Sequence, residues 1–365
     1  MNQDLLFRIA LTKIPSIGPI LTRNLIHHFH SAKFVFEASL KELLKVQGIS
    51  AQLAKSILAK NTFKNAEEEL VFLEEENINC IFFNDDAYPE RLKHNHGSPV
   101  ILYSKGNLTL DHPRNVAIVG TRKYTPIGKQ NTENLVEGLK KYNVQIVSGL
   151  AYGIDFLAHN KAVEQNIPTI GVLGHGLSMI YPYDHKVLAN AMLENGGLLT
   201  EFPFKTGINK DQFPMRNRIV AGLCDAIIVV ESAVKGGSII TAEYANNFNK
   251  DVFAFPGRIQ DKQSGGCNRL IKINKAHLLE KPEDIAYIMG WNKENRGIGI
   301  QQTLFVDLSK QDEKVIETIK KYGESSFDKI SYDTEIQNSE LASLLLNLEF
   351  KGIIKSLPGK RFILN

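Results

Sequence analysis

Residues 116–122 read Val-Ala-Ile-Val-Gly-Thr-Arg, and this stretch decides the fold class. Four apolar residues in a row, mostly β-branched, are typical of a strand that is buried on both faces. The glycine that follows them predicts a tight turn. Similar apolar runs recur at 145–147, 169–173, 197–200, 226–230 and 251–255, with helical patterns between them. This alternation predicts an α/β fold in which helices cover both faces of a parallel sheet.

Residues 1–75 form a separate helical domain by their apolar periodicity. Two short turns with a glycine beside apolar residues interrupt it, at 14–19 (Ile-Pro-Ser-Ile-Gly-Pro) and at 46–50 (Val-Gln-Gly-Ile-Ser). Such turns are similar to those of helix-hairpin-helix motifs, where a glycine lets backbone amides approach a DNA phosphate. A glycine between helices can equally be a left-handed C-cap, so both interpretations stay open.

The chain after residue 290 predicts a polar linker at 291–310 and a small domain at 311–365. Helical patterns at 314–321, 326–331 and 339–350 precede two short extended runs, which together describe a winged helix. Its third helix carries or adjoins Glu335, Glu340 and Glu349, which would repel DNA phosphates. We therefore expect a protein contact or weak DNA binding from this domain.

Composition excludes several classes of protein. The 365 residues suffice for two or three domains, and the net charge of +3 means that any nucleic-acid site must be a local basic patch. The beginning of the chain lacks the pattern of a signal peptide, and no run approaches the ~18 apolar residues of a membrane helix. The three scattered cysteines, and the histidines at 27, 28 and 30, make no ligand pattern for a metal. We expect a cytoplasmic protein without a metal or a membrane anchor.

Glycine and hydroxyl residues follow several of the predicted strands. In parallel sheets ligands bind at the carboxyl ends of strands, and helix N-termini there attract phosphate. One such turn is weak evidence, but several on one edge favour an extended polyanion. The turn residues that we select are Gly120, Thr121, Ser148, Gly149, Leu150, Gly236, Gly237 and Ser238.

Cations occur in or near the same loops. We select Arg122, Lys186, Arg216, Asn217, Arg218, Lys235 and Lys250 as contacts, and we expect Arg122, Ser148, Ser238 and Lys250 to face one another in an accessible row. A solvated surface position is the alternative for each single cation. For Arg216 and Arg218 an ion pair with Asp225 or Glu201 competes. Phe253 is a core strand residue or a platform on which a base stacks.

Signatures of enzymes are mostly missing. No GxGxxG follows the first strand, and no GxxxxGK[ST] or GxSxG motif occurs. Asp155 and His159, one helical turn apart, could be a base and its orienting partner, but we prefer a role in pinning their helix. We assign no catalytic residue and no cofactor.

Five segments in the same order resemble hallmarks of the DprA/Smf family of DNA-processing proteins. They are residues 116–122, 146–155, 216–223, 236–242 and 253–257. The resemblance implies an extended Rossmann-like core at 80–290 that binds single-stranded DNA without a nucleotide. It also implies a helix-hairpin-helix (SAM-like) start, a winged-helix end, a role in natural transformation and the loading of RecA recombinase. Carried over by position, it assigns DNA contacts to Arg122, Ser148, Gly149, Leu150, Gly236, Gly237, Ser238, Lys250 and Phe253. It further implies a homodimer through the later part of the core, for which we select residues 257–270.

Two features depart from the family pattern. Asp184 adds a negative charge beside Tyr181-Pro182-Tyr183, where many members are more basic, and Lys186 compensates for it. Residues 274–277 (Asn-Lys-Ala-His) replace the usual Gly-Ala, which leaves the dimer contact in doubt.

Two other functions remain open. Residues 235–243 resemble the PGGxGTxxE loop of nucleotide-cleaving proteins, so Glu243 could act in N-glycosidic hydrolysis, although Lys235 and Ser238 replace key members of that loop. Alternatively, the protein is a scaffold that recruits partners through its C-terminal domain.

Overall fold

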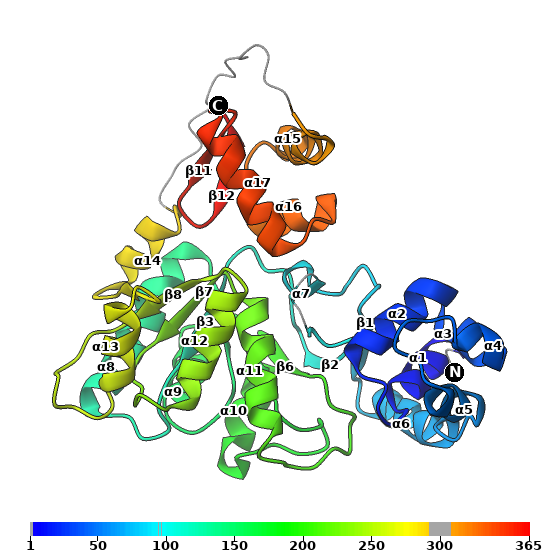
Figure 1. The fold of residues 1–365 in the computed structure, drawn as a ribbon. Helices are drawn as coiled ribbons and strands as arrows, with labels where there is room; N and C mark the ends of the chain where they lie inside the picture. Colours follow the sequence, from blue (N-terminus) through cyan, green and yellow to red (C-terminus); the bar gives the residue numbers. More distant parts are fainter. Residues whose placement is uncertain (1–2, 94, 96, 292–307) are drawn as a thin grey trace.

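The computed structural model of the protein describes residues 3–93, 95, 97–291 and 308–365. Most of the predicted linker, residues 292–307, lies outside the described residues. Figure 1 shows a group of N-terminal helices beside a large central sheet, and a C-terminal group of elements at one end of that sheet.

The first 75 residues are helical, as predicted. Their helices are α1 (Gln3–Thr12), α2 (Pro19–Phe29), α3 (Ala32–Glu37), α4 (Leu40–Leu43), α5 (Ala51–Leu58) and α6 (Phe63–Glu75). Gly18 is the N-cap of α2 with an extended backbone, whereas Gly48 has a φ of +89° and needs glycine for its turn. A Cβ on Gly48 would lie 2.6 Å from the side chain of Leu21, so this turn also fixes how the two hairpins pack.

The predicted apolar runs form the central sheet, which confirms the α/β fold with a mostly parallel sheet. Its strands follow the order β1-β2-β6-β5-β4-β3-β7-β8-β9. All neighbours from β6 to β9 are parallel, while β1 and β2 add an antiparallel edge. The strands are β1 (Asn79–Phe82), β2 (Ile101–Gly106), β3 (Asn115–Val119), β4 (Gln145–Ser148), β5 (Thr169–Val172), β6 (Gly196–Thr200), β7 (Ala226–Val229), β8 (Asp251–Ala254) and β9 (His277–Leu278).

Alternation along each strand divides the core into two faces. In β3, Val116 and Ile118 pack with residues of α8 and α9, whereas Ala117 and Val119 pack with residues of α11 and α12. The helices of this region are α7 (Glu90–Lys93), α8 (Pro126–Leu139), α9 (Ile154–Glu164), α10 (Lys186–Met192), α11 (Gln212–Leu223), α12 (Gly237–Asn247), α13 (Gly265–Lys272) and α14 (Pro282–Ile288), with 3₁₀ turns η1 (Lys140–Tyr142) and η2 (Tyr183–His185). None of the described helices is long and apolar enough to span a membrane.

The order of the parallel strands creates a switch point. After β3 the chain adds β4, β5 and β6 on one side, and then returns to place β7 on the other side of β3. Strands β3 and β7 are paired from Val116 with Ala226 to Val119 with Val229. Loops that leave them therefore diverge at the carboxyl edge, where such sheets bind ligands.

The C-terminal residues build their own small core of helices and strands. These elements are α15 (Lys310–Tyr322), β10 (Ser325–Ser326), α16 (Phe327–Thr334), α17 (Asn338–Phe350), β11 (Ile354–Leu357) and β12 (Arg361–Leu364). A capping box between Ser309 and Asp312 begins α15. Contacts to the central part come from Lys360, which donates to the carbonyl of Asn249 at 2.7 Å, and from Tyr332, whose hydroxyl lies 3.1 Å from the ammonium of Lys93.

Candidate nucleic-acid interface

Hydrogen bonds join the loops that leave β3, β4 and β7 at the carboxyl edge of the sheet. The amide of Thr121 donates to the carbonyl of Glu231 at 2.8 Å, and the amide of Ile154 donates to the carbonyl of Thr121 at 3.2 Å. Gly153 makes the second contact possible, because it has a φ of +87° and a Cβ there would lie 2.2 Å from the Thr121 carbonyl. The Asn217 side chain adds α11 to the group by a 3.4 Å bond to the Gly237 carbonyl. The three loops thus form one connected surface.

Two internal carboxylates occupy amide sites of these loops. Asp155 accepts from the amide of Gly149 at 3.1 Å, and Glu231 accepts from the amide of Thr125 at 2.9 Å. Both carboxylates are buried, and Glu231 fills the space that a Cβ on Gly128 would take. Positions that could hold a single phosphate inside the crevice are therefore closed by the protein's own negative charges. An anion has to bind on the outer side of the loops.

The start of α12 remains open. Its N-cap, Gly236, makes no side-chain hydrogen bond to the first turn, and Gly237 is exposed with no atom within 4 Å of the position of a Cβ. Arg122 and Lys235, in the adjacent loops, are exposed as well. Uncapped amides, the helix dipole and two cations together favour a phosphate group at this point.

Arg216 is a structural residue. Its guanidinium, 5% exposed, donates to the carbonyls of Gly149 and Val172 beneath the loops, and burial lowers its pKa to about 10. A Cβ on Gly149 would lie 2.3 Å from this guanidinium, so the glycine in the β4 loop is needed for Arg216. Burial likewise raises the pKa of the Asp155 carboxyl, although Arg216 opposes that shift.

Arg218 forms an ion pair, which was the predicted alternative to a DNA contact. Its partner is Glu201, whereas Asp225 pairs with Arg91 instead. Burial raises the pKa of Glu201 in spite of this pair. In this structure the predicted phosphate contacts of Arg216 and Arg218 are wrong for their side chains, because carbonyls and Glu201 already hold the guanidinium groups.

Three further selected residues turn their side chains inward. Ser148 is fully buried and donates to the carbonyl of Ile118 at 2.6 Å, and Ser238 donates to the hydroxyl of Ser232 at 2.7 Å. Leu150, also fully buried, has a φ of +54°. The predicted accessible row of hydroxyls is therefore wrong, and these residues shape the loops through their backbone.

Lys250 and Phe253 need a larger correction. Lys250 precedes β8 and lies at the amino edge of the sheet, opposite the candidate surface, where its ammonium pairs with Asp328 of α16. Phe253 is 0% exposed and packs in the core between the sheet and the α8–α9 layer. Neither residue can reach a nucleic acid on the carboxyl edge. Both errors arise because a position in sequence does not say which end or face of a strand a residue occupies.

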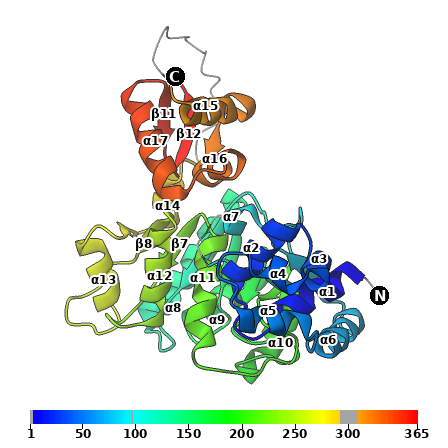
Figure 2. The ribbon, with the colours of Figure 1, turned by 45° about the vertical axis from the view of Figure 1, so that its right-hand side comes forward.

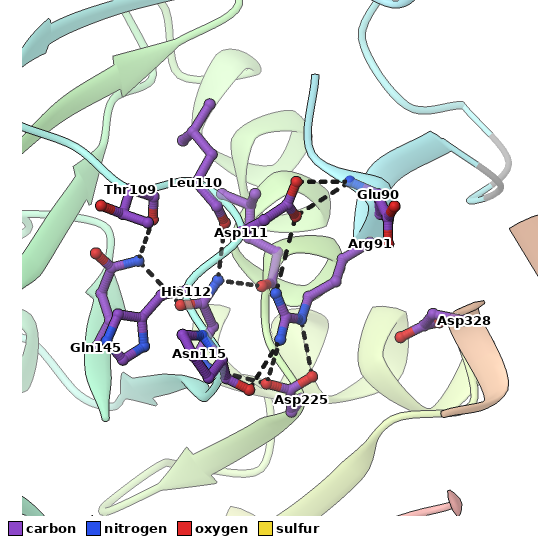
Figure 3. A network of polar contacts seen from close by, with 12 residues as sticks. Glu90, Arg91, Thr109, Leu110, Asp111, His112, Asn115, Gln145, Asp225 and Asp328 are labelled. Atoms are coloured by element: carbon purple, nitrogen blue, oxygen red, sulfur yellow. Dashed lines mark hydrogen bonds and ion pairs between the residues drawn. The ribbon is translucent and has the colours of Figure 1, made fainter. Parts of the chain in front are cut away.

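A network of hydrogen bonds and ion pairs connects polar residues at the amino edge of the sheet (Figure 3). Arg91 donates to both oxygens of Asp225, at 2.8 and 3.0 Å, and Asp225 also accepts from the amide of Asn115 at 2.9 Å. The Asn115 side chain in turn accepts from Gln145 at 2.9 Å. Asp328 faces this network from the C-terminal elements (Figure 3). Arg91, Asp225 and Asp328 also line a hollow of about 290 Å³, so the choice of the carboxyl edge rests on the general preference of parallel sheets to bind ligands there.

Aromatic side chains that sequence reasoning passed over lie on the exposed edge. Tyr152, in the β4 loop, and Tyr181 and Tyr183, after β5, are 43%, 42% and 74% exposed. The ammonium of Lys186 lies 5.9 Å from the ring centre of Tyr183, and the Tyr152 hydroxyl donates to Asp184 at 3.2 Å. The Tyr-Pro-Tyr run at 181–183, in the loop between β5 and α10, was the available signal. These rings supply the flat apolar surface that buried Phe253 does not.

The side chains of Asp155 and His159 have different hydrogen-bond partners. Asp155 binds loop amides, whereas Nδ1 of His159 lies 2.7 Å from the hydroxyl of Thr169 in β5. His159 is fully buried, and this burial lowers its pKa to about 3. Both side chains hold α9 against the sheet, as the pinning interpretation expects.

Known proteins resemble this chain over nearly its full length. A family described as DNA recombination-mediator protein A matches residues 79–290. The chain belongs to this family, which includes the proteins named DprA and Smf. A SAM-like helix-hairpin-helix tandem matches residues 8–60, which confirms the predicted motif class of the N-terminal helices. Membership of the DNA recombination-mediator family gives the chain the role of a DNA-processing recombination mediator.

Individual members of the DprA/Smf family support this assignment. Protein Smf of Synechocystis sp. is 30% identical, with 99% of each chain covered, and protein Smf of Escherichia coli is 33% identical over 87% of this chain and 85% of its own. The crystal structure of DprA from Streptococcus pneumoniae has a TM-score of 0.68 at 32% identity, covering 77% of this chain and 96% of that one. A structure of DprA from Helicobacter pylori, described by its single-stranded DNA binding mode, has a TM-score of 0.52 at 31% identity and covers 57% of this chain and 93% of that one.

Proposed function

We propose that this DprA/Smf protein binds single-stranded DNA, independently of sequence and without cutting it, along the carboxyl edge of its central sheet. The observation that carries the proposal is the open start of α12, together with exposed Arg122 in the loop after β3 and exposed Lys235 in the loop before α12. The amides of Gly149 and Thr125 in the neighbouring loops are bound by carboxylates. An external row of charges and rings suits a polymer better than a single nucleotide.

The residues assigned to the interface are revised accordingly. We keep Gly120, Thr121, Arg122, Lys186, Asn217, Lys235, Gly236 and Gly237 as direct contacts, and we add Tyr152, Tyr181 and Tyr183 as stacking surfaces. Gly149 is buried and its amide binds Asp155, so it joins the residues that support the loops. Ser148, Leu150, Arg216, Arg218 and Ser238 support the loops from inside. The division at residues 1–75, 80–290 and 311–365, with a winged helix as the last part, belongs to the same proposal.

The test is a salt titration of binding, with a polythymidine strand and a duplex of equal length. Each phosphate neutralised on a single strand contributes about 0.7 log units of affinity per log unit of salt. Arg122→Ala should weaken single-strand binding and flatten the slope by about that amount. Lys33→Ala, an exposed cation of α3 far along the chain, is the control. Equal affinity and slope in wild type and Arg122→Ala would contradict the site.

The alternative function, N-glycosidic hydrolysis of nucleotides, requires that a nucleotide bind beside Glu243. Glu243 lies on α12 and is exposed, but Lys235 and Ser238 replace key members of the nucleotide-cleaving loop, and the Ser238 hydroxyl donates to Ser232 inside the protein. We infer that the protein does not hydrolyse nucleotides. Release of free base from nucleoside monophosphates by the wild type, abolished in Glu243→Gln, would overturn this inference.

The protein is further proposed to load RecA onto the bound strand and to dimerise through residues 257–270. Ile259, in the loop after β8, is 93% exposed and α13 (Gly265–Lys272) follows it at the end of the sheet. Ile259→Glu should shift sedimentation from dimer to monomer while single-strand binding per chain persists. RecA filament assembly on DNA coated with a single-strand binding protein measures the loading step.

A further inference from the structure

The N-terminal helices contain a polar hollow that the proposed binding edge does not use. Its volume is about 670 Å³, and it lies between the segment after α1 and the helix α5 with the loop that follows. Apolar Ile14, Pro15, Ala51 and Ala59 form part of its lining, and the polar residues that line it are Lys13, Gln52, Lys55, Ser56, Asn61, Thr62 and Asn65. Among the described residues around it there is no carboxylate. A concave surface with amides and cations and without negative charge is suited to a nucleic-acid chain.

A second hollow continues the first toward the central sheet. It has a volume of about 330 Å³ and shares Lys13 and Asn65 with the larger one. Its far side is lined by Pro203, Lys205 and Thr206, which belong to the loop after β6. The two hollows therefore adjoin at Lys13 and Asn65, and we refer to the pair, which reaches from α5 to the loop after β6, as the groove.

The loop after β6 connects this groove to the carboxyl edge of the sheet. The amide of Gly176 donates to the carbonyl of Thr206 at 2.9 Å, and the amide of Ser178 donates to the carbonyl of Phe204 at 3.1 Å. Gly176 and Ser178 belong to the loop after β5, which continues to exposed Tyr181 and Tyr183. The groove thus begins where the stacking surface of the proposed interface ends.

The junction between the two parts is well fixed. Buried Glu69 of α6 accepts from the amide of Phe204 at 2.5 Å and from the ammonium of Lys13 at 3.1 Å. The rings of Phe72 and Phe204 stack with centres 5.1 Å apart, and the ammonium of Lys205 lies 4.0 Å from the Phe72 ring centre. Since Glu69 is already paired, exposed Glu68 is the negative charge of the smaller hollow that a strand has to pass.

We propose that this groove binds nucleotides of the same single strand that lies on the sheet edge, so that the N-terminal helices lengthen the binding site. Lys55 contacts phosphates, while the amide side chains of Gln52, Asn61 and Asn65 contact the bases without selecting a sequence. Lys13 stays paired with Glu69 and lines the groove without a free charge. The turn glycines Gly18 and Gly48 do not line either hollow, but Ile14 and Pro15 of the first hairpin turn line the larger one, so the groove adjoins that turn. This inference rests on the proposed function.

The experiment measures the affinity of the full chain for polythymidine strands of increasing length. Lys55 is exposed, so Lys55→Gln removes a charge from the groove without disturbing the core. We expect the variant to bind short strands like the wild type. For long strands it should lose affinity roughly fivefold, an effect of about 1 kcal/mol, and flatten the salt slope by about 0.7. Glu68→Gln should instead strengthen binding of long strands, and Lys33→Gln, on α3 outside the groove, should change neither.

The outcomes separate the two levels of the proposal. An equal loss at every length, an equal loss for duplex DNA, or no loss at any length in Lys55→Gln would each overturn the groove as a continuation of the strand path. The proposed function itself fails only if the wild type does not bind single strands, or if Arg122→Ala binds short strands as tightly as the wild type.

Discussion

Lys250 and Asp328 form an ion pair that joins the beginning of β8 to α16 across 78 residues of sequence. The Lys250 side chain is 4% exposed, so the C-terminal elements cover it almost completely. Figure 2 shows these elements at one end of the sheet. That end is the amino edge, which leaves the carboxyl edge free of them.

Because of this ion pair, we expect substitutions of Lys250 to lower the stability of the protein without changing its affinity for single-stranded DNA. Lys250→Met removes the cation and leaves the carboxylate of Asp328 partly buried without its partner, which should lower the free energy of unfolding by about 1.5–3 kcal/mol. Asp328→Asn should have a similar effect, and the double variant should lose less than the sum. Denaturant unfolding measures the cycle. Single-strand affinity should stay at the wild-type value, and a marked fall would return Lys250 to the binding site.

We expect a DNA base to stack on an aromatic ring that is exposed, such as Tyr183, and not on a ring that is buried, such as Phe253. Tyr183→Ala removes an exposed ring, so we expect a loss of about 1–3 kcal/mol in single-strand binding if one base stacks on it. Its unfolding curve should not change. Phe253→Ala instead opens a cavity in the core and should destabilise the fold by about 3–5 kcal/mol. Any Phe253→Ala protein that remains folded should bind normally, and reversed results would contradict the assignment.

Gly149 should tolerate no side chain. Gly149→Ala places a Cβ against the buried Arg216 guanidinium, and we expect a destabilisation of about 1–3 kcal/mol by overpacking. Gly207→Ala is the matched control, because no atom lies within 4 Å of its Cβ position and its φ is not in the left-handed region. Thermal unfolding of the two variants compares them directly. Equal melting temperatures would show that Arg216 can move aside.

Acid should destabilise the protein partly through His159. Burial holds this side chain neutral in the folded state down to a pH of about 3, whereas the unfolded chain takes up its proton below about pH 6.5. The unfolded state therefore binds more protons between these values, and stability falls as the pH is lowered through that window. One such group contributes a slope of at most about 1.4 kcal/mol per pH unit.

His159→Gln removes this titration but keeps a polar side chain. Urea unfolding of the variant between pH 7 and pH 5 should show a smaller decrease in stability than the wild type. The same decrease in both proteins would mean that other groups carry the acid sensitivity.

Sequence reasoning predicted the sheet and the edge at which we propose that DNA binds, but only some of the residues that the structure exposes there. The apolar runs at 116–119 and 226–230 predicted buried parallel strands. The observed strands β3 and β7 pair in parallel, and their ends lie within one residue of the predicted limits. Arg122 and Lys235 were selected because they lie in loops that follow strands, and such loops leave a parallel sheet at its carboxyl edge. Lys250 was misplaced because it precedes its strand, and Tyr152 was missed because a single ring in a loop gives no periodic signal.

Local sequence determined the elements of this protein, because helix and strand patterns depend on neighbouring residues and on whether a segment is buried. It also determined the family, because the glycine turns stand in a fixed order along the chain. Only the tertiary structure decided which polar groups are free. Asp155 and Glu231 close the amides of their loops, Glu201 holds Arg218, and Asp328 holds Lys250. Three of these contacts join residues 17 to 106 positions apart, and a hydrogen bond or ion pair depends on distance in space, which the order of residues does not give.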